Sequence, residues 1–201
     1  MVKQKFGRWI IIIAALFIIA YALVAFNTPD YPDIITPKPD FGTAASSVRI
    51  VEFSDLQCPA CGSAHPLITQ LLDEYGDRVS FKYYHFPLRS IHPNAQKAAE
   101  AAECANDAGK MREFIDLAFE RQNDLSRDAL KQYARAIGIN GTNFDACLDS
   151  SAKYDTVEAD FRIGLQRGVD STPTFFINDI ELTDRSYEGF KARIDSLLAV
   201  Q

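Results

Sequence analysis

Residues 48–61 read VRIVEFSDLQCPAC, and this stretch decides the fold. Its first six residues are rich in β-branched and aromatic side chains and stop at Ser54, which is typical of a β-strand. Cys58 and Cys61 follow the strand, and beyond them apolar residues recur at the spacing of one helix face until Gly76. The sequence therefore predicts a Cys-x-x-Cys motif in the turn between a strand and a helix.

The position of this motif predicts redox chemistry. Cys58 is expected at the N-cap and Pro59 at the first helical position, where its missing N–H costs nothing. The unpaired N–H groups and the dipole of the helix end stabilise a thiolate, so Cys58 is the expected attacking sulfur. Cys61, which follows Pro59 and Ala60 one turn further in, is the expected resolving thiol.

A structural disulfide and half of a zinc site are the alternative interpretations of the motif. Zinc usually requires a second close pair of ligands, and Cys104 and Cys147 lie 43 residues apart. His65 could add a ligand, but a lone helical histidine is more often packed or solvated. We therefore favour a redox-active pair and expect neither a metal nor another cofactor.

The rest of the chain alternates between two patterns. A second strand is predicted over 79–86, so the domain opens as strand, helix, strand, which suggests a parallel βαβ unit. From 93 to 151 there is no strand pattern, and helices are expected over 94–108, 111–122, 128–137 and 143–148, followed by 154–168. The β pattern then returns, with strands predicted at 174–177 and 180–182 and a closing helix at 187–200.

Residues 9–26, WIIIIAALFIIAYALVAF, form an uncharged apolar run of 18 residues. As a helix this run rises about 27 Å, roughly the thickness of a hydrocarbon core. The preceding Lys3, Lys5 and Arg8 predict a cytoplasmic N-terminus, with the rest of the chain on the extracytoplasmic side of the cytoplasmic membrane. A cleaved signal peptide with a site at 20–22 is the alternative; we favour a single-pass anchor because the apolar run continues past that site.

The segments predicted along the chain are a basic tip with the anchor (1–26), a Pro-rich tether (27–47), the first part of an α/β fold (48–92), an all-helical insertion (93–151) and the second part of the fold (152–201). The chain carries 21 Lys and Arg against 27 Asp and Glu, a net charge of −6. Three of the basic residues and none of the acids lie in the first 26 residues, so the remainder is more acidic still. Phosphates would repel it, which argues against a nucleic-acid partner.

Two further positions fit a redox site. Glu52 lies six residues before Cys58, and a buried carboxyl there could relay a proton to and from Cys61; an exposed strand carboxylate is an equally weighted alternative. Thr172-Pro173 precedes the strand at 174–177. A cis bond at this point would expose the Thr172 backbone for β-type pairing with an extended substrate.

The combination of Glu52-x5-Cys58-Pro59-Ala60-Cys61 with a distant Thr172-Pro173-Thr174 resembles the thioredoxin superfamily. The helical block makes the chain similar to the membrane-anchored, DsbA-like thiol-disulfide oxidoreductases of bacteria, as do the phrases FSDLQCP (53–59), HFPL (85–88) and GVDSTPTF (168–175). The resemblance covers about residues 46–200.

This resemblance implies a thioredoxin fold with an inserted helical subdomain, preceded by one transmembrane helix. It implies that Cys58 is the nucleophile, Cys61 the resolving thiol, Glu52 the buried carboxylate and Pro173 a cis proline beside the pair. Substrate contacts are expected at Thr172, Pro59 and Ala60. Strongly oxidising members often carry histidine where this chain has Ala60, so the direction of electron flow stays open.

The remaining cysteines, Cys104 and Cys147, are expected to form a structural disulfide across the insertion. Four cysteines allow three pairings, and two free thiols or an electron-relay pair are the alternatives.

We expect a tethered thiol oxidase that introduces disulfides into unfolded or newly exported Cys-containing proteins and is reoxidised by a membrane-embedded, quinone-linked enzyme. A reductase or isomerase on the same fold is one alternative. A tethered chaperone or binding module, with the cysteines only as structural staples, is another.

Overall fold

The computed structural model describes residues 38–200. The predicted anchor over 9–26 and the first part of the predicted tether lie outside the described residues. Within residues 38–200, no helix has the length and apolar character needed to cross a membrane.

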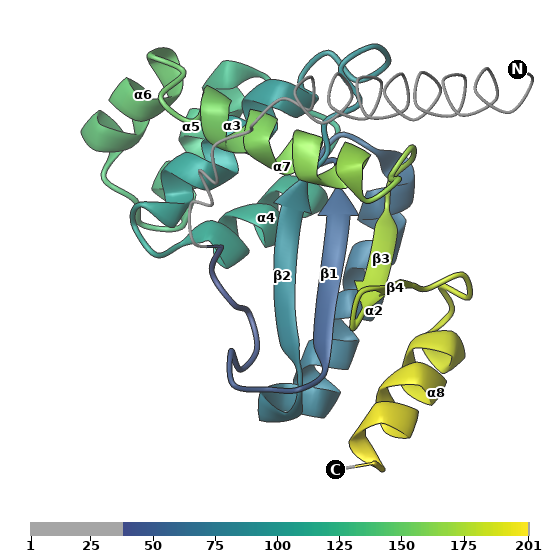
Figure 1. The fold of residues 1–201 in the computed structure, drawn as a ribbon. Coiled ribbons are helices and arrows are strands. Elements are labelled where there is room, and N and C mark those ends of the chain that lie inside the picture. Colours follow the sequence, from purple (N-terminus) through teal and green to yellow (C-terminus); the bar gives the residue numbers. More distant parts are fainter. Residues whose placement is uncertain (1–37, 201) are drawn as a thin grey trace, which may run out of the picture. The chain divides into compact units, whose positions relative to one another are not determined.

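A four-stranded sheet of order β2-β1-β3-β4 forms the centre of the domain (Figure 1). Its strands are β1 (Arg49–Ser54), β2 (Ser80–His85), β3 (Thr174–Ile177) and β4 (Ile180–Glu181). β1 pairs parallel with β2 and antiparallel with β3. Helix α2 (Pro59–Tyr75) connects β1 to β2, so the predicted parallel βαβ unit is confirmed.

The remaining helices are α3 (Ala95–Asn106), α4 (Met111–Glu120), α5 (Arg127–Ala136), α6 (Gly141–Asp149), α7 (Tyr154–Gln166) and α8 (Tyr187–Leu198), with a short 3-10 turn η1 (Gly76–Arg78) after α2. Helices α3 to α6 form the insertion, which contains no strand, as predicted. They gather beside the carboxyl ends of β1 and β2, and α7 crosses the sheet near the same ends (Figure 1).

The two faces of β1 enter different cores because its side chains alternate. Ile50 belongs to the larger core, which α2, α8 and the insertion complete, whereas Phe53 packs with Phe86 in a smaller core beneath α7. Gly164 allows α7 to approach closely, since a Cβ at this position would lie 2.6 Å from the Phe86 ring. The face shared by Ile50 and Glu52 is therefore the one that α2 covers.

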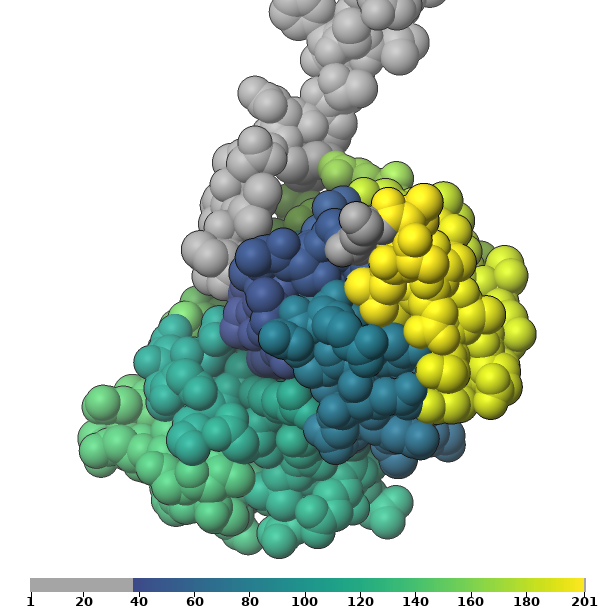
Figure 2. Space-filling view, turned by 90° about the horizontal axis from the view of Figure 1, so that it is seen from below, coloured from purple at the N-terminus to yellow at the C-terminus, as the bar shows by residue number. Residues whose placement is uncertain are grey.

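Helix α8 packs beside α2, and the two lie side by side in Figure 2. The Tyr75 hydroxyl donates a 2.8 Å hydrogen bond to Asp195 Oδ1, and Lys191 Nζ lies 3.0 Å from Glu74 Oε1. The last helix thus closes the outer side of the helix that carries the cysteines.

The described chain begins at a buried ion cluster. The Lys38 ammonium contacts the Glu103 carboxylate of α3 and lies 2.6 Å from Asp160 Oδ2 of α7. The Lys38 side chain is only 3% exposed, and the two carboxylates are buried as well. His85 Nε2 of β2 lies 3.3 Å from Glu103 Oε1. Lys38 therefore joins the insertion to the thioredoxin-like part.

The segment after Lys38 packs along β2. Phe41 N donates to Phe81 O at 2.9 Å, and Thr43 N donates to Val79 O at 2.8 Å. These bonds correct the predicted extent of the tether, because residues 38–47 are part of the folded domain. Proline spacing could not reveal this contact, which depends on the free edge of a strand that comes later in the chain.

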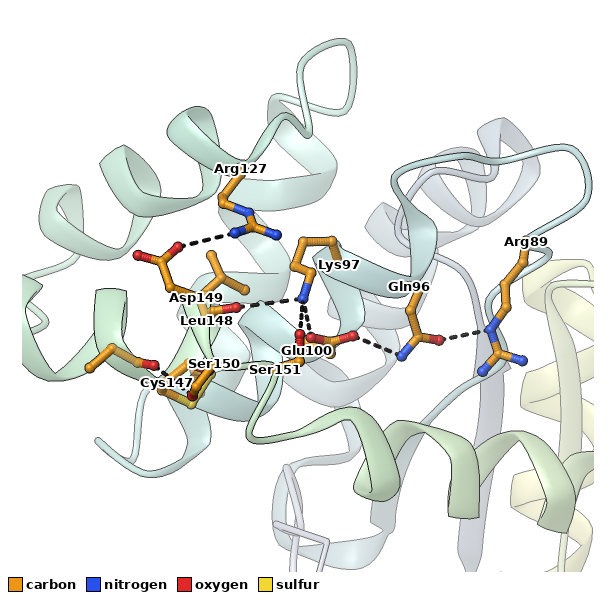
Figure 3. A network of polar contacts seen from close by, with 12 residues as sticks. Arg89, Gln96, Lys97, Glu100, Arg127, Cys147, Leu148, Asp149, Ser150 and Ser151 are labelled. Carbon is orange, nitrogen blue, oxygen red and sulfur yellow. Dashed lines mark hydrogen bonds and ion pairs between the residues drawn. A yellow bond between two sulfur atoms is a disulfide. The ribbon is translucent and has the colours of Figure 1, made fainter.

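A disulfide and a polar network fasten the insertion to itself (Figure 3). Cys104 of α3 is bonded to Cys147 of α6, the pairing favoured from the sequence. Beside it, Lys97 Nζ donates to Ser151 Oγ at 2.9 Å and to Leu148 O at 3.5 Å. The ammonium thus satisfies a carbonyl at the negative end of α6.

Candidate redox site

Cys58 and Cys61 lie at the beginning of α2, where the turn after β1 places them. Cys58 is the N-cap residue with extended backbone (φ −74°), and Pro59 is the first helical residue. Both cysteines are free thiols, with Cys58 7% and Cys61 0% exposed. Pro59 and Ala60 are exposed beside them, so a substrate can approach the pair from this side.

The surroundings of Cys58 favour its thiolate. A hydrogen bond from the Cys61 thiol, together with the contact to Thr172 and the backbone N–H groups of Ala60 and Cys61, lowers the pKa of Cys58 to about 5, against the opposing effect of burial. These N–H groups are the unpaired donors at the start of α2. Cys58 is therefore ionised at neutral pH.

Cys61 behaves in the opposite way. Burial raises its pKa well above the usual value, and the hydrogen bond to Cys58 and the negative charge of Glu52 raise it further. The Asp55 N–H, 3.5 Å from Cys61 Sγ, opposes this shift only weakly. At neutral pH the site thus holds one thiolate and one thiol, as nucleophile and resolving residue require.

Glu52 is buried, the outcome that the sequence left open. Glu52 is 2% exposed and lies opposite Tyr83 of β2 in the sheet. Burial raises the pKa of Glu52 to about 7, although the Ser54 hydroxyl and the charge of His65 oppose the shift. The carboxyl group therefore gains and loses a proton near neutral pH. Its role as a relay stays a prediction.

The loop before β3 lies beside the cysteines. The Thr172–Pro173 peptide bond is cis, and Thr172 O lies 3.5 Å from Cys58 Sγ. Arg185 Nη1 donates a 2.7 Å hydrogen bond to Pro173 O and holds the loop. The structure thus brings the Cys58–Cys61 pair together with Thr172 and Pro173, which follow it by more than a hundred residues in sequence.

Sequence reasoning missed Gln122, which follows α4. Its Nε2 donates hydrogen bonds of 2.8 Å to both Leu56 O and Cys58 O, and so fixes the loop that carries the nucleophile. Gly62 leaves room for this side chain, because a Cβ there would lie 2.7 Å from Gln122 Oε1. Nothing in the local sequence signals the contact.

Asp55 was also missed. Its Oδ2 accepts 2.8 Å contacts from Leu88 N and His92 Nδ1, and its Oδ1 accepts from Gln57 N at 2.7 Å. These bonds join the end of β1 to the loop after β2. An acid directly after a predicted strand was the available signal, and His92 is the partner that could not be foreseen.

Among the described residues, one group has the composition of a metal site. The ligand atoms of His85, Glu103 and Asp160 lie within 4.8 Å of one another. The Lys38 ammonium contacts both carboxylates and already supplies a positive charge there. This cluster is a structural ion group, and it contains none of the residues of the cysteine site.

The sequence matches the model of a family described as thioredoxin over residues 37–196. Among solved structures, oxidised BdbD from Bacillus subtilis superimposes with a TM-score of 0.71 at 24% identity, covering 79% of this chain and 91% of that chain. The thiol-disulfide exchange protein alpha-DsbA2 from Wolbachia pipientis gives 0.70 at 23%, covering 81% and 88%. DsbA from Chlamydia trachomatis gives 0.73 at 17%, covering 85% and 96%. These likenesses show a common fold.

Curated relatives match only in part. The Na(+)/H(+) antiporter NhaA 3 of Salinispora tropica is 35% identical over 137 residues, which cover 68% of this chain and 21% of the relative. The antiporter NhaA of Herminiimonas arsenicoxydans is 32% identical over 157 residues, covering 75% and 25%. The chain thus spans about a fifth to a quarter of the length of these relatives.

Proposed function

The chain belongs to the thioredoxin family, and from this premise we propose that it is a protein thiol-disulfide oxidoreductase that oxidises cysteines of exported proteins. The observation that supports this proposal is the difference between the two cysteines at the start of α2. The pKa of Cys58 is lowered, which favours its thiolate, whereas the pKa of the buried Cys61 is raised, which keeps it a thiol. Antiport is not part of the proposal, because the matched region is a small fraction of the relatives named for it.

The oxidising reaction proceeds through a mixed disulfide. A substrate thiolate attacks Cys58 Sγ of the Cys58–Cys61 disulfide, and Cys61 leaves as a thiolate that takes up a proton. A second substrate thiolate then attacks the substrate sulfur of the mixed disulfide, and Cys58 leaves as a thiolate. The substrate gains a disulfide, and the enzyme holds two electrons as a thiolate and a thiol. Glu52 is a buried carboxyl group whose charge acts on Cys61, and it can supply this proton.

The low pKa of Cys58 favours oxidation of the substrate over its reduction. At pH 7 a thiol of pKa about 5 is stabilised as a thiolate by about 2–3 kcal/mol relative to an ordinary thiol. That free energy belongs to the reduced enzyme only, so it raises the reduction potential by about 50 mV. Ala60 does not raise the reduction potential further, because it places no charge between the cysteines.

We further propose that the domain acts on the extracytoplasmic side of the membrane, with residues 9–26 as its anchor and a membrane-embedded, quinone-linked enzyme as its reoxidant. Two observations support this location. The basic residues precede the apolar run, and the Cys104–Cys147 disulfide is of a kind that persists in oxidising compartments.

The reduction potential of the Cys58–Cys61 pair tests whether the protein oxidises or reduces its substrates. The full chain is equilibrated in glutathione and dithiothreitol buffers, alkylated, and analysed at each cysteine by peptide mass spectrometry. A Cys58–Cys61 potential above about −200 mV is expected for an oxidase, and a value below about −270 mV would instead make the protein a reductase. Cys61→Ser should accumulate a mixed disulfide with reduced substrate protein, and Cys58→Ser should not. A Cys58→Ser variant that retains full activity would leave only the chaperone alternative.

A further inference from the structure

A small cavity lies behind the redox pair, between α2, α4 and the sheet. Its walls include Glu52 of β1, Tyr83 of β2 and His65 of α2. About 10 Å³ is available to the centre of a water molecule, which is room for about one water. The Tyr83 hydroxyl is buried and has no hydrogen-bond partner among the described residues. A water in this cavity would therefore find polar partners beside Glu52.

The outer wall of the cavity leads to the surface. His65 is 19% exposed at its side chain, and Asp116 of α4, which also lines the cavity, is 44% exposed. His65 Nε2 lies 2.8 Å from Asp116 Oδ1, and the imidazole ring lies 4.7 Å from the Phe119 ring. The carboxylate and the aromatic ring hold the imidazole in one place. Exposure thus increases in steps from Glu52 through His65 to Asp116.

We propose that His65, held by Asp116, passes protons between the buried Glu52 and solvent while Cys61 reacts. An imidazole suits this task because it can accept a proton on one ring nitrogen and release one from the other. The inference rests on the proposed function, since it names the proton route of the same site. It makes His65 a positioning and proton-transfer residue that touches neither substrate nor the sulfur atoms.

The proton balance follows the reaction in both directions. When the disulfide is reduced, the departing Cys61 thiolate takes a proton from Glu52, and Glu52 regains one from solvent through His65. When the pair is reoxidised, the Cys58 thiolate first attacks a disulfide of the oxidant and forms a mixed disulfide, releasing one oxidant thiolate. Cys61 then gives its proton to Glu52 and attacks Cys58 Sγ, which expels the second oxidant sulfur as a thiolate, and the proton leaves through His65. Cys58 needs no proton at pH 7 because it enters and leaves as a thiolate.

Charged groups of both signs line the cavity around His65. Asp116 and Arg112 face it from α4, with opposite charges, and Glu52 faces it from β1. Tyr83 of β2 is neutral at physiological pH. Thr69 of α2 lines the same cavity without a titratable group, and therefore offers a matched control.

A two-phase reaction separates the steps. Reduced protein is mixed in a stopped-flow instrument with one equivalent of 5,5′-dithiobis(2-nitrobenzoate), in a dilute buffer that donates protons poorly. The first release of thionitrobenzoate reports the attack by Cys58. The second release reports the attack by Cys61 on the mixed disulfide, the step in which Cys61 must lose its proton.

His65→Ala should leave the rate of the first phase unchanged and slow the second phase about tenfold. This decrease is smaller than the one that follows removal of a group that transfers the proton directly, because water can still carry protons slowly. Added imidazole should restore the second phase in His65→Ala and leave wild type unaffected. His65→Gln, which keeps the wall filled, should show the slow phase without rescue. Thr69→Val should match wild type in both phases.

The outcomes are distinct. An unchanged second phase in both His65 variants, or a slow phase in His65→Ala that imidazole does not restore, would overturn the proton route and leave the proposed function intact. A wild-type protein that shows neither phase, although its thiols are reduced, would overturn the proposed function together with the route.

Discussion

Replacing Glu52 by Gln should stabilise the protein in a pH-dependent way when Cys58 and Cys61 are reduced, as they are in the structure. The pKa of Glu52 is about 7 in the fold, against 4.5 for an ordinary glutamate, because burial penalises its charge. Since the folded-state pKa is raised, the folded state binds more protons than the unfolded state between these values. The stability of the wild type therefore falls as pH rises from about 4.5 to 7.

The magnitude follows from the two pKa values. Linkage between them lowers the wild-type free energy of unfolding by about 2–3 kcal/mol from pH 5 to pH 8 through Glu52 alone. Glutamine carries no charge, so the free energy of unfolding of Glu52→Gln, relative to that of the wild type, should rise by about the same amount between pH 5 and pH 8. Any cost of burying the amide is constant with pH and cancels in the difference.

Urea unfolding of the full chain, followed by far-ultraviolet circular dichroism in one solubilising buffer, measures this difference. Tryptophan fluorescence is unsuitable because the only tryptophan, Trp9, lies outside the described domain. Glu181→Gln, at an exposed position on β4, is the control and should differ from wild type by less than about 0.5 kcal/mol at both pH values. If the advantage of Glu52→Gln were the same at pH 5 and pH 8, the reasoning about burial and charge would be refuted.

Three further predictions concern the ion cluster, the disulfide and the nucleophile. Lys38→Met should lower the free energy of unfolding by about 3–5 kcal/mol, because it leaves two buried carboxylates without their cation. Lys110→Met is the control: it removes an exposed ion pair and should lower the free energy of unfolding by less than about 1 kcal/mol. Equal costs in urea unfolding at pH 7 would contradict this. Replacing Cys104 and Cys147 together by Ala should cost up to about 4 kcal/mol, because the cross-link closes a sequence separation of 43 residues; an unchanged midpoint would count against it. Thiolate absorbance of the reduced protein should titrate near pH 5 and disappear in Cys58→Ser; a single transition near pH 9 would show that the site does not lower this pKa.

Local patterns predicted the framework because the framework is local. The strand, the cysteine turn and the following helix lie within 30 residues, and hydrophobic periodicity reports each of them directly. The helical insertion was evident for the same reason, since its helices carry their own periodicity. The resemblance added what no local pattern contains, the placement of Pro173 beside Cys58.

The rest depends on partners that are distant in sequence. Alternation along β1 assigned Glu52 to a face, but its burial follows from the helix and the insertion that cover that face. Lys38 finds Glu103 across 65 positions, and no composition near Lys38 indicates a buried ion. Gln122 reads as the last residue of a predicted helix, and only the fold brings its side chain to the carbonyl groups of the cysteine turn.

The grip of Gln122 on the cysteine turn has an evolutionary consequence. The helical insertion cannot be excised as an independent module, because deletion of 93–151 would leave Leu56 O and Cys58 O without their shared donor. Positions 62 and 122 should therefore covary among homologues. Where Gly62 is replaced by a residue with a side chain, Gln122 must become shorter, since the two would otherwise occupy the same space. A change at either position would be accepted only together with its counterpart, which ties the history of the insertion to that of the redox centre.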